Sequence, residues 1–340
     1  MHRSASLDAA ASGRPCRLRG ALPGLLALAA LLSGCAALGP SVHLPDVVER
    51  PVLIEEVVFH PQTEFHCGPA SLATVLDHSG VDADPDALAP LVYLPEREGS
   101  LQVELLGATR RAGRIPYVID RDPAALVAEL EAGRPVLVMQ NLRTPGRPVW
   151  HYAVVTGVDP ARNRFILNTD ERQALPVRAS GFMRTWNWAN RWAFVVLAPG
   201  EMPAQADPVR YAEAVADFER VAGGEAGATA WRAALLRWPH DHRPRLALGN
   251  LAYGQGDREQ AAALYGEGLR ARPLEPVLSN NLATVLGELG CADTARGVAG
   301  PALAALEPDS PWAGRLRATL DGLPGSGADG ADCVRWALQP

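Results

Sequence analysis

Residues 62–73 read Gln-Thr-Glu-Phe-His-Cys-Gly-Pro-Ala-Ser-Leu-Ala, with a cysteine at the start of an apolar segment of small residues. Apolar residues after Cys67 recur at helical spacing, which predicts a buried helix from the cysteine to about residues 79–80. Pro69 suits the first turn, where a missing N–H costs little. A thiol at a helix start lies near unpaired N–H groups and the positive end of the helix dipole. We therefore expect the pKa of Cys67 to lie below that of a free thiol; the alternative is a buried, purely structural cysteine.

Two further side chains complete a candidate catalytic set. Gln62 precedes the cysteine by five residues, and its amide is predicted to form an oxyanion hole with the Cys67 N–H. His151 begins an apolar strand over residues 151–158, where a polar ring needs a partner, so we predict that it is the general base. His60 stays open as an alternative base.

The residue that orients His151 is sought on the next strand. Residues 159–163 read as a turn between the strand that starts at His151 and a second strand over residues 164–168. If Val158 pairs with Asn163, then Asn168 and Asp170 lie on the same face as the histidine. Both residues are therefore candidates to fix the orientation of the imidazole.

Together these motifs resemble papain-like cysteine peptidases, above all the bacteriocin-processing peptidases that act on double-glycine leaders. The resemblance rests on Gln62, on Cys-Gly-Pro-Ala at residues 67–70 and on His-Tyr-Ala-Val-Val at residues 151–155. It spans roughly residues 52–197 and implies a papain-like fold, a peptide or protein substrate and cleavage after small residues such as Gly-Gly. The family usually has Asp, and papain has Asn, as the third catalytic residue. Alignment with them places Asn168 at this position, so the resemblance implies that Asn168 orients His151, with Asp170 as the reserve. Helices followed by mainly antiparallel strands independently predict an α+β domain.

The N-terminus has the features of a targeting segment. Basic residues at positions 3, 14, 17 and 19 precede an apolar run over residues 21–32, which is too short for a comfortable transmembrane helix. Leu-Ser-Gly-Cys at residues 32–35 resembles a bacterial lipobox, so residues 1–34 are predicted to be a lipoprotein signal peptide and Cys35 the lipidated residue. Ala36 suggests, by the same resemblance, the outer membrane, with the protein facing the periplasm. The alternative is an ordinary signal peptide or a short anchor helix.

Three cysteines remain after Cys35: Cys67, Cys291 and Cys333. In an exported protein an odd cysteine is either a free reactive thiol or an intermolecular bridge. The simplest partition leaves Cys67 free and pairs Cys291 with Cys333, and three reduced thiols are the alternative.

The chain after residue 203 repeats itself at intervals of about 34 residues. Ala234, Gly268 and Ala302 share this spacing, as do Leu235, Leu269 and Leu303. The period and the small residues resemble tetratricopeptide repeats, so we predict an all-α repeat domain that binds a protein partner. The predicted order is a tether at 35–51, a peptidase domain at 52–200, the repeats at 203–320 and a tail at 321–340.

Composition excludes several classes of function. Among 340 residues all 32 basic ones are arginine, and the net charge of −6 argues against a nucleic-acid partner. Zinc spacings, a Walker loop and Rossmann glycines are missing from the sequence, so no cofactor or metal is predicted. The aromatic residues 182, 186, 188 and 192 either line a substrate groove or belong to the core. Two other functions stay open: an inactive peptidase-like binding protein, and an amidase or acyltransferase that uses the same residues.

Overall fold

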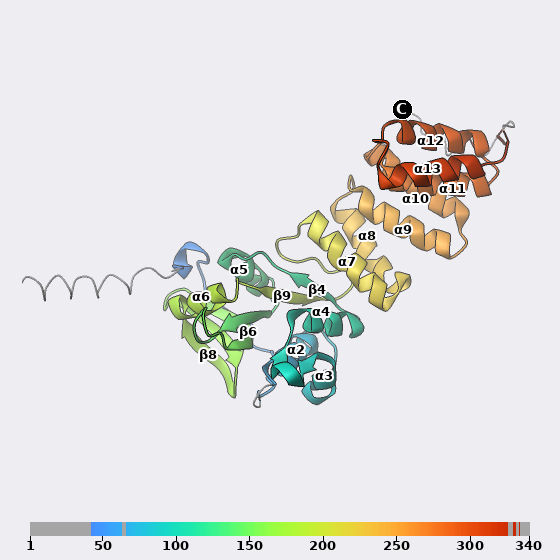
Figure 1. Ribbon diagram of the computed structural model, residues 1–340. Helices are drawn as coiled ribbons and strands as arrows, with labels where there is room; N and C mark the ends of the chain where they lie inside the picture. The colour runs from blue at the N-terminus through green and yellow to red at the C-terminus, as the bar shows by residue number, and fades with distance from the viewer. Residues whose placement is uncertain (1–41, 63–65, 326–328, 331–332, 334–340) are drawn as a thin grey trace, which may run out of the picture. The chain divides into compact units, whose positions relative to one another are not determined.

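The computed structural model describes residues 42–62, 66–325, 329–330 and 333. The predicted signal peptide and Cys35 lie outside the described residues. An α+β part comes first in the chain, and a mostly helical part follows it (Figure 1). Both parts of the predicted fold class are therefore confirmed.

A seven-stranded antiparallel sheet forms the centre of the first part. Its strands lie in the order β4-β9-β5-β6-β7-β8, and β1 extends the edge of β6 beyond the end of β5. A separate two-stranded hairpin, β2–β3, precedes α4. The strands are β1 Val52–Leu53, β2 Tyr93–Leu94, β3 Gly99–Ser100, β4 Ile115–Val118, β5 Val136–Asn141, β6 Trp150–Asp159, β7 Arg164–Thr169, β8 Arg172–Arg178 and β9 Ala193–Leu197.

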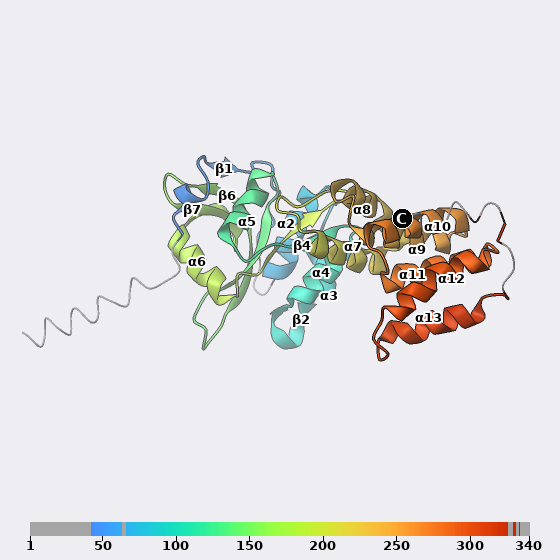
Figure 2. The ribbon, with the colours of Figure 1, turned by 90° about the horizontal axis from the view of Figure 1, so that it is seen from above.

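Helices cover both faces of this sheet because its central strands are apolar on both sides. Leu137, Val154 and Phe194 pack against α2 (Cys67–His78), α3 (Pro85–Val92) and α4 (Gln102–Arg111). Their neighbours in sequence point to the opposite face, as the pleat requires, and pack against α5 (Pro123–Glu131) and α6 (Ala179–Trp188). Figures 1 and 2 show α2, α3 and α4 grouped together, apart from α6. Short 3-10 turns lie at Leu44–Asp46 and Pro95–Arg97.

Helix α2 begins at Cys67, as the sequence predicts, and it is the buried helix of this part. Leu72 and Leu76 are fully buried against the sheet. Gly68 lies so close to Ser100 of the β2–β3 hairpin that a Cβ atom there would overlap the serine hydroxyl. The glycine therefore lets the hairpin approach the first turn of α2, beside the cysteine.

The predicted register of the β6–β7 hairpin is wrong. The hairpin pairs Val158 with Phe165, not with Asn163, because the pairing begins at Asp159 and Arg164. An irregularity between Val155 and Gly157 then shifts the pairing by one residue and sets Asn168 opposite Val154. Of the two alternatives for the aromatic residues, the core is the one found, since Phe182 and Trp186 are fully buried.

The helical part consists of hairpins that follow the predicted period. The first helices of three pairs begin at residues 208, 242 and 276 and the second helices at 224, 258 and 292, an interval of 34 residues throughout. Among the described residues no helix is long and apolar enough to cross a membrane. The helices are α7 Pro208–Ala222, α8 Gly224–Arg237, α9 His242–Gly254, α10 Arg258–Ala271, α11 Pro276–Glu288, α12 Ala292–Ala304 and α13 Pro311–Gly322.

The first helical hairpin shares a core with the sheet. Tyr211 and Phe218 of α7 belong to the same buried cluster as Tyr117 of β4. Arg210 forms a two-pronged ion pair with Asp120, at 2.7 and 2.8 Å. A domain boundary between residues 200 and 203 remains a prediction, and α7 packs across it.

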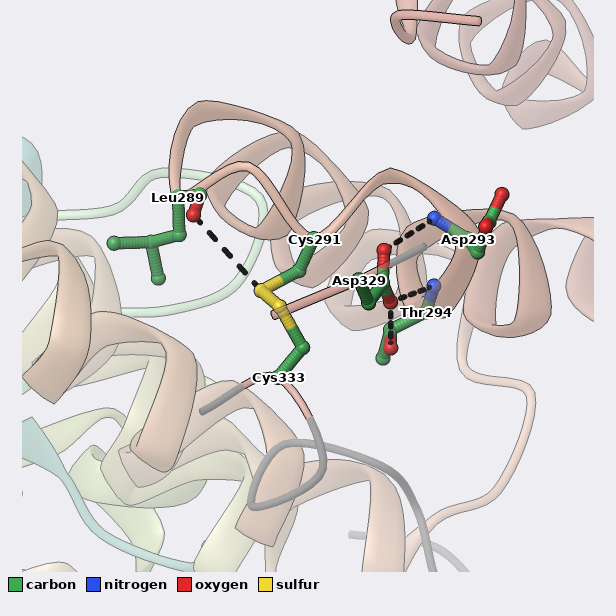
Figure 3. The surroundings of a disulfide bond; sticks show 6 residues. All are labelled: Leu289, Cys291, Asp293, Thr294, Asp329 and Cys333. Atoms are coloured by element: carbon green, nitrogen blue, oxygen red, sulfur yellow. Dashed lines mark hydrogen bonds between the residues drawn. A yellow bond between two sulfur atoms is a disulfide. The ribbon is translucent and has the colours of Figure 1, made fainter. Parts of the chain in front are cut away.

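A disulfide joins Cys291 to Cys333, while Cys67 is free, so the predicted partition of these three cysteines is confirmed. Beside the bridge, Asp329 accepts hydrogen bonds from the backbone N–H groups of Asp293 and Thr294 in the first turn of α12 (Figure 3). The C-terminal segment is thus fastened to the last repeat by a covalent bond and a helix cap.

Candidate active site

One cleft of about 780 Å³ brings together most of the predicted site residues. Gln62, Cys67, His151 and the reserve residue Asp170 all line it, together with Tyr152. One wall is the end of the β2–β3 hairpin, residues 97–101, and the other is the apolar segment over residues 148–150. Asn168 is not among the residues that line this cleft.

Cys67 is the first residue of α2, and its side chain is half-buried. Burial raises the pKa of the thiol, and the backbone N–H groups of Tyr152, Gly68 and Cys67 offset this only in part. The negative charge of Asp170 adds a small further increase in the pKa. The expectation of a lowered pKa is therefore wrong, because the helix-start effect is smaller than the cost of burying a thiolate.

His151 is 8% exposed at the second position of β6. Its Nε2 atom lies 2.7 Å from the Thr169 hydroxyl and 3.5 Å from Oδ1 of Asp170. Burial lowers the pKa of the imidazole, Asp170 opposes this, and Arg172 adds to it. The imidazole is therefore neutral at neutral pH and is able to accept a proton. The sequence did not predict Thr169 as a site residue, because a threonine between Asn168 and Asp170 in the sequence matches no catalytic motif.

The other candidate base, His60, lies away from this cleft. Its Nε2 atom pairs with Asp77 of α2, whose second oxygen accepts the N–H of Ala83. These contacts give His60 a structural role in holding the segment before α2 against the helix.

The structure favours the reserve residue over Asn168 as the partner of His151. The Asn168 side chain accepts the backbone N–H of Ala174 at 2.9 Å, so it holds the β7–β8 hairpin together. Asp170 lies in the turn after β7 with a left-handed φ of 51°. Its carboxylate is near His151 and also accepts a hydrogen bond from the Arg172 guanidinium at 2.8 Å. The shifted hairpin register sets Asn168 opposite Val154, whose side chain points to the other face of β6 from His151.

Four hydrogen bonds to other described residues hold Gln62, which belongs to no helix or strand. Its backbone N–H donates to the carbonyl oxygen of Asp170 at 2.9 Å, and its side-chain oxygen accepts the Asp170 N–H at 3.2 Å. Its Nε2 donates to the Ser71 hydroxyl at 3.1 Å and to the Tyr152 carbonyl oxygen at 3.4 Å. Asp170 therefore contacts both the histidine and the glutamine of the set.

The arrangement contains the groups that acyl transfer requires. A thiol, a neutral imidazole beside a carboxylate, and amide N–H donors line a single cleft. Within the described residues there is no group of three or more His, Cys, Asp or Glu side chains that would hold a metal ion.

A family model described as the Peptidase_C39-like family matches residues 54–191. This domain has a C39-like peptidase fold. The match spans α2 and the hairpin of His151, and it ends before β9 and the helical repeats. No curated protein matches the chain.

Three solved structures are also similar to a part of this chain. A C39-like peptidase of Bacillus anthracis is 17% identical, with a TM-score of 0.36, over 44% of this chain and 98% of its own. The peptidase domain of Streptococcus ComA, a bifunctional ABC transporter of a quorum-sensing pathway, is 22% identical, with a TM-score of 0.35, over 42% of this chain and 97% of its own. A double-glycine-motif protease of an AMS/PCAT transporter, in complex with its leader peptide, is 20% identical, with a TM-score of 0.35, over 43% and 96%.

The two candidates for the third residue make different predictions. Asp170→Asn should lower kcat/KM for peptide hydrolysis by about 10²-fold, the lower end of what a general base contributes, because it removes the charge beside His151. Asn168→Ala should lower thermal stability but leave kcat/KM per folded molecule nearly unchanged. Rates are compared after counting reactive Cys67 thiols by alkylation. A larger loss of kcat/KM in Asn168→Ala than in Asp170→Asn would return the role to Asn168.

Proposed function

We propose that the protein is a lipid-anchored cysteine peptidase that hydrolyses a peptide or protein substrate in the cell envelope. The observation that carries this proposal is the cleft in which Cys67, Gln62 and the His151–Asp170 pair meet. The match of residues 54–191 to the Peptidase_C39-like family supports the same reaction class.

In the proposed mechanism the Cys67 sulfur attacks the carbonyl carbon of the scissile bond, while His151 accepts the thiol proton. The developing oxyanion receives hydrogen bonds from the Cys67 N–H and from the Gln62 amide. The Gln62 amide gives up its longer hydrogen bond to the Tyr152 carbonyl oxygen to make this contact. His151 then gives the proton to the leaving amine as the C–N bond breaks. Water attacks the thioester with His151 as base, which releases the carboxylate and restores the thiol.

The test is peptide cleavage by the purified full-length protein. A mixture of synthetic peptides, including sequences with Gly-Gly, is incubated with the wild type and with Cys67→Ala, and new termini are found by mass spectrometry. The proposal expects new peptide termini with the wild type only. An inactive binding protein produces none, and an amidase or acyltransferase modifies side chains or transfers acyl groups without cutting the peptide chain. Either result overturns the peptidase proposal.

We also propose that Cys35 carries a lipid and that the protein faces the periplasm. The motif at residues 32–35 supports the anchor, and the Cys291–Cys333 disulfide is typical of an oxidising compartment. Partner binding through the helical part is likewise a proposal, which is supported by its 34-residue period and resemblance to tetratricopeptide repeats.

Cys35→Ala should move the protein from the membrane fraction to the soluble fraction. Two or more acyl chains give stable anchoring, and their loss leaves no lipid attachment. The measurement is immunodetection of both fractions after cell lysis, with Cys67→Ala as a matched cysteine control that keeps its anchor. Membrane association of Cys35→Ala equal to that of the wild type would refute the lipoprotein proposal.

A further inference from the structure

Resting on the proposed function, we propose that Ser71 is a positioning residue that holds the Gln62 amide at the oxyanion site. Ser71 lies four residues after Cys67 on α2 and is 1% exposed. Residues four apart share one face of a helix, so the serine hydroxyl lies one turn behind the thiol. The Gln62 Nε2 donates to this hydroxyl at 3.1 Å.

The remaining contacts of Gln62 fix which end of its amide is the donor. The Asp170 N–H can only donate, and it binds the side-chain oxygen of Gln62 at 3.2 Å. The Tyr152 carbonyl oxygen can only accept, and it lies 3.4 Å from Nε2. One N–H of Gln62 is thus anchored by Ser71, while the other makes only a long contact among the described residues and is available to a substrate oxyanion.

Gln62 depends on these contacts because no helix or strand holds it. Ser71, in contrast, is part of the same rigid helix as the nucleophile. The hydrogen bond from Gln62 to Ser71 therefore sets the place of the donor nitrogen relative to the Cys67 sulfur. A small displacement of a catalytic group is enough to slow a reaction strongly.

A double-mutant cycle of the full-length protein tests this role. Ser71→Ala should lower kcat about tenfold, which is part of the 10²–10³ that one oxyanion-hole donor contributes, and leave KM unchanged. Gln62→Ala should lower kcat further. In the Gln62→Ala background, Ser71→Ala should have no additional effect, because the serine acts only through the glutamine.

Two controls separate positioning from structural damage. Alkylation of Cys67 by iodoacetamide forms no oxyanion, so its rate should be the same in Ser71→Ala and the wild type. Thr74→Val removes another buried hydroxyl from α2, one that donates to the Ala70 carbonyl oxygen of its own helix, and it should keep the wild-type kcat.

Three results would overturn the role of Ser71: a wild-type kcat in Ser71→Ala, an equal tenfold loss in the Gln62→Ala background, or slowed alkylation. If the wild type cleaves no peptide, the proposed function fails, and the cycle is then measured on the dissociation constant of a peptide aldehyde. Such an aldehyde adds to the Cys67 thiol and forms an oxyanion-like hemithioacetal. A tenfold higher Kd in Ser71→Ala, with no such increase when Ser71→Ala is made in the Gln62→Ala background, supports the positioning role of Ser71. If the wild type binds no aldehyde, the positioning role is refuted together with the proposed function.

Discussion

Replacing Cys67 with serine should lower kcat/KM for peptide hydrolysis by about 10⁴-fold or more, as expected for the loss of a nucleophile that acts with its base as a unit. The two side chains are nearly isosteric, so the half-buried site at the start of α2 should keep its packing. The alcohol is far less acidic than the thiol, and the N–H groups around it cannot make up the difference. Activity is measured by peptide cleavage and folding by thermal melting.

Cys67→Ala provides the matched control for this prediction. It should show the same loss of activity, and neither variant should be alkylated by iodoacetamide at position 67, because neither replacement side chain carries a thiol. Retention of more than a few per cent of wild-type activity in either variant would show that another residue is the nucleophile.

His151→Ala should lower kcat/KM by about 10²–10⁴-fold, the usual contribution of a general base.

The pH profile of wild-type activity follows from the two shifted pKa values. Burial moves the pKa of His151 below 6.5, so protonation of the base should reduce activity only at pH values below 6.5. Burial moves the pKa of Cys67 above 9.0, so loss of the thiol proton, which the leaving amine needs, should reduce activity only above pH 9.0.

The raised pKa of Cys67 also predicts how the rate of its alkylation depends on pH. Because the thiol is protonated at neutral pH, the rate of Cys67 alkylation should rise with pH and approach its maximum only above pH 9.0. A rate that is already maximal near pH 6 would mean that a thiolate–imidazolium pair is formed in the free protein. The neutral pair described here would then be incorrect.

Local sequence signals were sufficient for the helix that carries the nucleophile. Pro69 and the apolar period after Cys67 specify a helix that starts at the cysteine, and the structure has it there. The unusual histidine at the start of an apolar strand identified the residue that lies beside Asp170. The helical period of 34 residues was visible because every repeat must bury the same small contact residues.

The choice between Asn168 and Asp170 could not be made from the sequence, because the predicted register of the hairpin set both on the face of His151. The irregularity between Val155 and Gly157 instead sets Asn168 opposite Val154, and Asp170 lies in the turn after β7. The raised pKa of Cys67 could not be predicted from the sequence either. A helix start is a local feature, whereas the burial of the thiol depends on the whole fold. The Ser71 contact joins an irregular segment to a helix and follows from no pattern in the sequence.

The most direct test of the central claim is detection of an acyl group on Cys67. Acetyl-glycylglycine p-nitrophenyl ester is mixed with the protein, the reaction is quenched in acid, and the intact mass and modified residue are determined. The chain contains no lysine, which removes the usual site of non-specific acylation. The proposed mechanism predicts a burst of p-nitrophenol and one acetyl-glycylglycyl thioester on Cys67, absent in Cys67→Ser. No adduct on Cys67 in the wild type, or the same adduct in Cys67→Ser, would contradict it.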